Sequence, residues 1–205
     1  INNNTNAAQF GGNVTATSGN VVLAYQTTVT GTVTSGNGSI TMGNEAVIGG
    51  DVISTGGGAV NVKYKSRITG SVTTTGAVTL ENQTQVGGSV NGGTCAIEVN
   101  YQAQVTGSVI SSTGTILMDN ESVAGACVKS TGSAAITLNY HSNVTGVCCG
   151  SSCGNSCVTN NSSYTMPAAC APAQTCIVDD FATGTLNPSL WNPVTLGGGF
   201  QPQVV

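Results

Sequence analysis

Aliphatic residues recur along the chain in four columns, each with a period close to nineteen residues. In a typical copy, Val78 and Leu80 stand two residues apart, Val86 follows six residues later, and the positions between them are polar. Residues two apart lie on one face of a β-strand, so the pattern predicts short strands with one buried and one exposed face. The columns are Val14, Val33, Val52, Val72, Val90, Val109 and Val128; Val21, Ile40, Val60, Val78, Ile97, Ile116 and Ile136; Leu23, Met42, Val62, Leu80, Val99, Met118 and Leu138; and Val29, Ile48, Ile68, Val86, Val105, Ala124 and Val144.

The copies begin at a glycine in all but one case. Short strands interrupted by Gly, Ser and Thr at this period predict an all-β fold, a parallel β-solenoid or β-helix in which each copy forms one coil of about three strands. Each coil buries about four aliphatic side chains, worth on the order of 1.5–3 kcal/mol apiece, so the stack is stable although no coil is stable alone. The copies start at Gly12, Gly31, Gly50, Gly70, Gly88, Gly107, Ala126 and Gly146.

A second period of about 38 residues runs through the copies. One column alternates between Tyr and Asn, and the residue five positions later alternates between Thr and Gly. Either coils of nineteen residues alternate a large corner residue with a small one, or one wide coil takes 38 residues. Coils of nineteen place Lys65 beside Glu45 and Lys63 beside Glu81, opposite charges on adjacent strands, and for this reason we favour them. The alternating columns are Tyr25, Asn44, Tyr64, Asn82, Tyr101, Asn120 and Tyr140, and Thr30, Gly49, Thr69, Gly87, Thr106, Gly125 and Thr145.

The tyrosine column allows two interpretations. Tyr25, Tyr64, Tyr101 and Tyr140 keep the parity of the buried columns, which favours side chains that fill a corner of the solenoid. Alternatively, the rings form an exposed stripe on which carbohydrate stacks. We favour the corner.

Charge is scarce in this chain, with 6% charged residues, a formal net charge of -4 and 39% hydrophobic residues. The combination argues against a disordered chain. The only cations, Lys63, Lys65, Arg67 and Lys129, form no extended basic patch, so no nucleic-acid partner is expected. No apolar run reaches the roughly eighteen residues that span a membrane.

The eight cysteines are candidates for disulfides. An even, clustered set in a chain with one histidine is typical of disulfides, and therefore of an extracellular or cell-surface protein from an oxidising compartment. A zinc site would need Cys/His pairs, and His141 is the only histidine, so we interpret Cys149, Cys153 and Cys157 as disulfide cysteines and assign no metal ligand. The disulfide candidates are Cys95, Cys127, Cys148, Cys149, Cys153, Cys157, Cys170 and Cys176.

The pattern divides the chain into four regions. Residues 1–11 form an N-terminal segment without an amphipathic cap, residues 12–147 a solenoid of about seven to eight coils, and residues 148–176 a Cys-rich joint stapled by disulfides. Residues 177–205 contain Trp191 and resemble the start of a concanavalin-like, laminin-G-type β-sandwich, a domain that would need well over about a hundred residues. The chain starts at Ile1 without a signal peptide, and we interpret it as a piece of a longer secreted precursor.

Two segments, TGSVTTTGAVTLENQTQVGGSV and GTVTSGNGSITMGNEAVIGGDV, resemble bactofilin repeats. That resemblance implies a right-handed β-helix that forms polymers, although bactofilins are cytoplasmic and lack this number of cysteines. The order of a β-solenoid, a Cys-rich joint and a DDF…W…GGGF segment is similar to MshQ-type surface proteins of mannose-sensitive haemagglutinin (MSHA) type IV pilus systems. This second resemblance implies a bacterial surface protein linked to pili or adhesion, and it carries over no catalytic residues.

No residue cluster favours catalysis or metal binding. The carboxylates are spread over several coils and His141 has no evident partner, so we assign no catalytic or cofactor-binding residue and expect neither an enzyme nor a cofactor. The acidic run Asp119–Glu121 lacks the glycine-rich turn of calcium-binding β-rolls. The carboxylates are Glu45, Asp51, Glu81, Glu98, Asp119 and Glu121.

A structural role is therefore the expected function. We expect a rigid stalk of a bacterial surface or pilus-associated adhesin, and the alternative is a self-assembling filament subunit. Ice binding is a weaker third candidate, because Thr15/Thr17 and Thr73/Thr75 fit a Thr-x-Thr array that Ile53, Asn91, Ile110 and Lys129 interrupt. The expected partners are other copies of the chain or pilus and surface proteins, with carbohydrate as a further partner.

Overall fold

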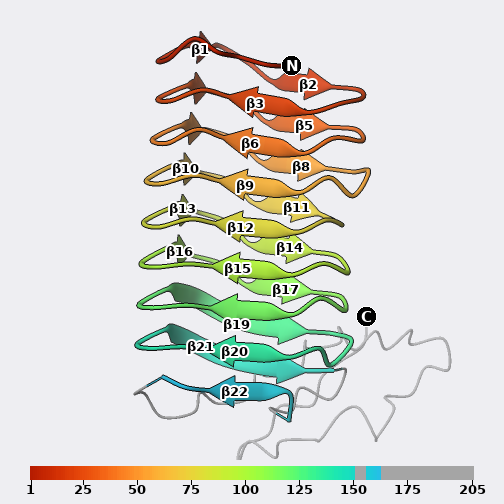
Figure 1. The fold of residues 1–205 in the computed structure, drawn as a ribbon, viewed down its shortest axis with the longest axis vertical. Coiled ribbons are helices and arrows are strands. Elements are labelled where there is room, and N and C mark those ends of the chain that lie inside the picture. Colours follow the sequence, from red (N-terminus) through yellow and green to blue (C-terminus); the bar gives the residue numbers. More distant parts are fainter. Residues whose placement is uncertain (151–155, 163–205) are drawn as a thin grey trace, which may run out of the picture. The chain divides into compact units, whose positions relative to one another are not determined.

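The predicted parallel β-solenoid is confirmed. The computed structural model describes residues 1–150 and 156–162, which stack as successive coils of β-strands (Figure 1). The regions predicted for residues 163–205, including the start of a β-sandwich, lie outside the described residues. In the described part of the chain, no helix is long and apolar enough to cross a membrane.

Each regular coil contains three short strands, and equivalent strands of successive coils form three parallel rows. The first row contains β2 (Val14–Ala16), β5 (Val33–Ser35), β8 (Val52–Ser54), β11 (Val72–Thr74), β14 (Val90–Gly92) and β17 (Val109–Ser111). The second row contains β3 (Val21–Leu23), β6 (Ile40–Met42), β9 (Val60–Val62), β12 (Val78–Leu80), β15 (Ile97–Val99), β18 (Ile116–Met118), β20 (Ile136–Leu138) and β22 (Val158–Asn160). The third row contains β1 (Gln9–Phe10), β4 (Thr28–Val29), β7 (Val47–Ile48), β10 (Arg67–Ile68), β13 (Gln85–Val86) and β16 (Gln104–Val105).

The register decides between the two coil lengths in favour of nineteen residues. Val14 pairs with Val33, and Val33 pairs with Val52, so each strand lies beside the equivalent strand of the next copy. A coil of 38 residues would instead place Val14 beside Val52. The second period of the sequence is therefore an alternation between adjacent coils.

The core lies inside the coils and is built from the predicted aliphatic columns. Alternate residues of each three-residue strand point inward, as in β9, where Val60 and Val62 are fully buried and Asn61 is not. The four columns stack without interruption from coil to coil. Val144 is the exception, because it is only partly buried against the core.

The corner between the third and first rows has no room for a side chain. A Cβ built on Gly70 would lie 2.7 Å from the carbonyl oxygen of Gly50 and closer still to Asp51 Oδ1. Asp51 Oδ1 accepts a hydrogen bond of 2.7 Å from the amide of Ser71. This corner ladder repeats from coil to coil, with acceptor side chains at Asn13, Thr32, Asp51, Ser71 and Ser89.

The same corner disappears in the last two full coils. Strands β19 (Val123–Ser130) and β21 (Asn143–Cys149) each run through the third and first rows as one strand. The register shifts between Ala124 and Cys127, so that Val147, and not Cys148, lies beside Val128. The repeat start that the sequence places at Gly146 is therefore displaced by one residue.

The stack also extends beyond the predicted solenoid at both of its ends. In the segment 1–11, Asn2 bridges to Val22 and β1 pairs with β4, so this segment adds most of a further coil. On the other side, β22 pairs with β20, although its residues belong to the predicted Cys-rich joint.

Candidate functional site

The most distinctive surface feature is a tight turn that joins the second and third rows in every coil. In the turn at residues 24–27, the amide of Thr27 donates to the carbonyl of Ala24 at 3.3 Å, and Gln26 has a φ of 55°. A positive φ at the third position is the type II pattern, which favours glycine or asparagine. The solenoid places longer side chains there in seven successive coils, although left-handed backbone costs such residues about 1–2 kcal/mol. This edge column is Gln26, Glu45, Lys65, Gln83, Gln102, Glu121 and His141.

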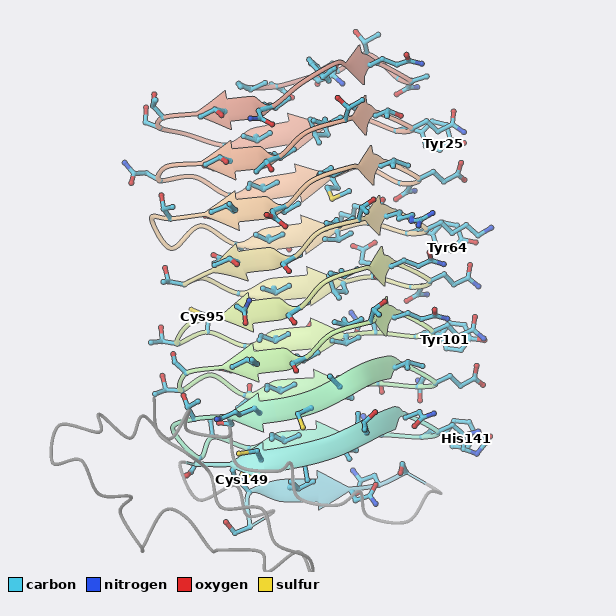
Figure 2. All side chains as sticks on the ribbon, turned by 180° about the vertical axis from the view of Figure 1, so that it is seen from behind. Tyr25, Tyr64, Cys95, Tyr101, His141 and Cys149 are labelled. Atoms are coloured by element: carbon cyan, nitrogen blue, oxygen red, sulfur yellow. A yellow bond between two sulfur atoms is a disulfide. The ribbon has the colours of Figure 1, made fainter. Side chains whose placement is uncertain are left out.

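The residue before each edge-column position is the alternating Tyr or Asn of the double period. The prediction that the tyrosines fill a corner of the core is wrong, because Tyr25, Tyr64 and Tyr101 are 38–41% exposed and Tyr140 is 56% exposed. Figure 2 shows Tyr25, Tyr64, Tyr101 and His141 along one edge of the stack. Strand parity does not continue past Leu23, because the tight turn at residues 24–27 follows it, and Thr27, two residues after the tyrosine, is buried in its place. We call Tyr25, Tyr64, Tyr101 and Tyr140 the edge tyrosines.

Neighbouring side chains contact three of the edge tyrosines. The Tyr25 hydroxyl donates a 3.1 Å hydrogen bond to Glu45 Oε2 of the next coil, and this bond to the carboxylate raises the pKa of Tyr25 above its ordinary value. The Nζ of Lys65 lies 5.1 Å from the centroid of the Tyr64 ring. His141 stacks on Tyr140 with ring centroids 3.9 Å apart.

Below the Tyr64 coil, polar side chains line a hollow beside the edge. Gln83 Nε2 donates to Gln102 Oε1 at 3.0 Å, and Gln102 Nε2 donates to Glu121 Oε2 at 2.7 Å. Gln85 and Gln104, paired on adjacent strands of the third row, complete the lining. We call these five residues the glutamine strip.

A second hollow continues from the glutamine strip along the third row. Arg67, Gln85 and Gln104 line it, and its floor includes Gly87. Gly87 is one of the alternating glycines, and a Cβ there would collide with the carbonyl oxygen of Thr69. A Cβ at Gly49 or Gly125 would lie equally close to the carbonyl of the threonine in the preceding coil, so this column needs glycine at every second coil.

The charge pairs expected from coils of nineteen residues are met in part. Lys63 forms an ion pair with Glu81 of the next coil, as predicted. Glu45 instead accepts hydrogen bonds from Tyr25 and from Gln26 Nε2, and Lys65 lies over its own neighbour Tyr64. Of the two expected charge pairs, Lys63–Glu81 is the one that forms an ion pair.

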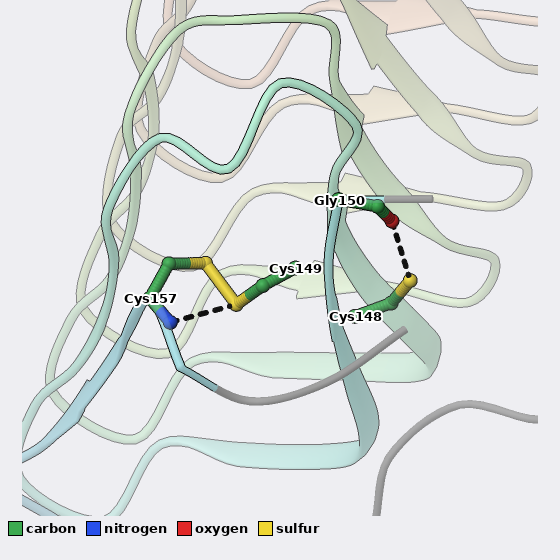
Figure 3. Close-up of a disulfide and its surroundings, with 4 residues drawn as sticks. All are labelled: Cys148, Cys149, Gly150 and Cys157. Atoms are coloured by element: carbon green, nitrogen blue, oxygen red, sulfur yellow. Dashed lines mark hydrogen bonds between the residues drawn. A yellow bond between two sulfur atoms is a disulfide. The ribbon is translucent and has the colours of Figure 1, made fainter. Parts of the chain in front are cut away.

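Cysteines gather in the last described coils. Cys149 and Cys157 form a disulfide, and Figure 3 shows it close to Cys148, whose Sγ contacts the Gly150 carbonyl. Cys127 and Cys148 each take part in a disulfide as well. Cys95 differs from the expectation, since it is a free, exposed thiol. The remaining candidates, Cys153, Cys170 and Cys176, lie outside the described residues.

The acidic run at Asp119 is engaged by amide side chains. Asp119 Oδ1 accepts a 2.9 Å hydrogen bond from Asn139 Nδ2, and Glu121 accepts from Gln102. Within residues 1–150 and 156–162, no group of three or more His, Cys, Asp or Glu side chains is placed to hold a metal ion.

The Thr-x-Thr positions considered for ice binding align on the first row. Thr15 pairs with Thr34, and Thr34 with Ile53. Thr73 pairs with Ile53 on one side and with Asn91 on the other. The threonine array of the first row is therefore interrupted, as predicted from the sequence.

Two sets of buried hydroxyls were not anticipated from the sequence. One set lies at the end of the first row, where Ser35, Ser54 and Ser111 each donate to a glycine carbonyl one coil back at 2.9–3.1 Å. The other set follows the edge column and includes Ser66, which donates to the Gly43 carbonyl at 2.7 Å. In the sequence, both sets appear as Ser or Thr at inward-facing positions next to a turn.

Comparison of the chain with protein-family models, with curated proteins and with solved structures gave no match to any of them.

Proposed function

We propose that the chain is a non-enzymatic, extracellular structural protein whose solenoid acts as the rigid stalk of a bacterial surface or pilus-associated adhesin. The observation that carries this proposal is the unbroken core. From Val14 to Leu138, each coil places buried aliphatic side chains directly beside those of its neighbours. Because all coils share this core, bending the solenoid at one coil would separate the packed side chains of that coil from those of its neighbour.

Backbone pairing adds to this stiffness. Strands in the interior of each row pair with an equivalent strand on both sides, so every interior coil is bonded to its neighbours through three rows. The eight strands of the second row, at ~4.8 Å each, give the solenoid a length of roughly 40 Å. Such an element suits the task of holding another domain away from its anchor.

Two further observations support the extracellular and non-enzymatic parts of the proposal. The disulfide between Cys149 and Cys157 favours an oxidising compartment. Within the described residues, the carboxylates that hydrogen-bond to other coils contact amides, as Asp119 contacts Asn139, or a tyrosine or lysine, as Glu45 and Glu81 do, and no two carboxylates form an acid–base pair. The resemblance to MshQ-type surface proteins points to the same role.

A specific feature favours a second candidate, the self-assembling filament subunit. β2 ends its sheet, and among the described residues no strand covers its outer edge. Unpaired backbone groups at a sheet edge can pair with a second chain. Stacking of solenoids end to end would use this edge.

The state of association separates the two candidates. Sedimentation velocity across a dilution series, with negative-stain electron microscopy of the same samples, should give single short rods at every concentration. Filaments that persist at the lowest concentration would contradict the stalk proposal and support the filament subunit.

A further inference from the structure

From the edge of the solenoid we infer a binding surface for an extended, uncharged β-1,4-linked polysaccharide. The surface consists of the edge tyrosines and the glutamine strip. It goes beyond the proposed stalk, because it gives the solenoid a ligand of its own.

The first argument is the exposure of the edge tyrosines. Among the described residues, the exposed large hydrophobic side chains are these four tyrosines together with Ile1 and Val47. Four of six thus occupy a single turn position. Exposed aromatic side chains that gather in one place are a mark of binding surfaces, and tyrosine offers a ring face together with a hydroxyl.

The second argument is the spacing of the rings. A tyrosine occurs in every second coil, and two coils measure about 9.6 Å at ~4.8 Å per strand. This is close to the length of one disaccharide unit in an extended β-1,4-linked chain, in which alternate sugars present the same face. The stripe from Tyr25 to Tyr140 spans six coils, or about 29 Å, enough for three such units.

The third argument is the chemistry between the rings. The amides of Gln83, Gln85, Gln102 and Gln104 line a hollow next to the Tyr101 turn, and an amide both donates and accepts hydrogen bonds. Sugar hydroxyls also donate and accept, so they can use both functions of the amide. The edge column carries one cation, Lys65, and two carboxylates, Glu45 and Glu121. Its charges nearly cancel, so a strongly charged polymer would gain little attraction here.

The fourth argument is the backbone of the turn. Glycine would adopt the positive φ of the edge column without strain, yet seven turns carry a longer side chain. These side chains hold one another and the tyrosines, through Glu45 on Tyr25, Lys65 over Tyr64 and His141 on Tyr140. Rings held in place before binding lose less conformational freedom when a ligand stacks on them.

A sedimentation assay with insoluble polymers tests the inference. The full chain is mixed with microcrystalline cellulose and with chitin, both β-1,4-linked, and with curdlan and insoluble starch as polymers of other linkage. We expect retention on at least one β-1,4-linked polymer and little on curdlan or starch. Equal retention on all four polymers, or retention on none, would overturn the inference.

Matched variants connect any retention to the edge. Replacing the two central rings in the double variant Tyr64→Ala/Tyr101→Ala should weaken binding by about tenfold or more, whereas Tyr64→Phe/Tyr101→Phe keeps the ring faces and should stay within about threefold. Thr73→Ala changes an exposed side chain of the first row, away from the edge, and should leave binding unchanged.

A fold control accompanies these variants. The tyrosine side chains are exposed, so the double alanine variant should keep the thermal midpoint of the parent. If it does not, the single variant Gln85→Ala, within the glutamine strip, replaces it and should also weaken retention. Unchanged retention in a folded edge variant would contradict the inference, while the stalk is judged separately by its association state.

Discussion

The regular coils and the last two full coils differ at one corner of the solenoid. In the regular coils, a glycine such as Gly70 separates the third row from the first, and the corner ladder joins each coil to the next. In the coil that contains β19, the equivalent residue is Ala126, and one strand runs through both rows, with a shift of register against β21 of the next coil. The amide of Ala126 still donates to the carbonyl of Gly107, as the corner glycines do.

This difference shows what the corner glycines do. At Gly107, as at Gly70, a Cβ would lie against the carbonyl carbon and oxygen of the preceding corner glycine. Ala126 brings that Cβ, and from this residue onward the corner opens into continuous strand. The sharp corner is thus a property of one column of glycines, and the aliphatic columns persist with or without it. Disulfides appear where the corner ladder is lost.

The largest expected effect comes from the disulfide of the last coils. The double variant Cys149→Ser/Cys157→Ser removes a cross-link between residues eight apart, worth about 2.5 kcal/mol by loop-closure entropy. Amide hydrogen exchange should become faster in β22 and β20 and stay unchanged in β9 and β12. Equal loss of protection across all coils would mean that the cross-link stabilises the whole stack.

A side chain at a regular corner should cost slightly less. Gly70→Ala forces the corner apart, and we expect the free energy of unfolding to fall by about 1–3 kcal/mol. Gly12→Ala is the matched control, because Gly12 holds the same repeat position in the first coil and a Cβ there meets nothing within 4 Å. Chemical denaturation measures both variants. If both variants lost the same free energy of unfolding, close stacking between coils would not explain the corner glycines.

The corner ladder itself should contribute a smaller amount. Asp51→Ala removes the acceptor of the Ser71 amide and should lower the free energy of unfolding by about 1 kcal/mol. Asp51→Asn keeps an oxygen in place and should retain most of that stability. If both variants lose the same free energy of unfolding, the charge of Asp51 contributes this stability and its hydrogen bond does not.

The smallest effect concerns the edge of the regular coils. Because the hydrogen bond to Glu45 raises the pKa of Tyr25, Glu45→Ala should return this pKa toward the ordinary value of a tyrosine. The folded state holds the Tyr25 proton more tightly than the unfolded state, so this contribution to stability is complete below the unfolded pKa and is lost as the pH rises through the folded one. Carbon-13 NMR of labelled tyrosine measures the titration, and an unchanged Tyr25 pKa in the variant would exclude Glu45 as the cause.

Some features of the fold were predictable because they follow from local periodicity. The spacing of two between Val78 and Leu80 identified a strand, and the return of the pattern after nineteen residues identified a coil. The pairing of Lys63 with Glu81 then followed from the coil length, and the structure has it. The expectation for Cys95 failed because the number of cysteines says nothing about which of them lie close together.

The sequence alone determined the solenoid and its buried columns and favoured coils of nineteen residues, since a strand places alternate residues on opposite faces and similar copies stack best in register. Only the tertiary structure decided which way the turn residues point. A positive φ at Gln26 sends Tyr25 outward and Thr27 inward, which strand parity cannot predict. It also decided where the corner is lost, because the close approach of the corner glycines to the preceding coil exists only in the folded stack.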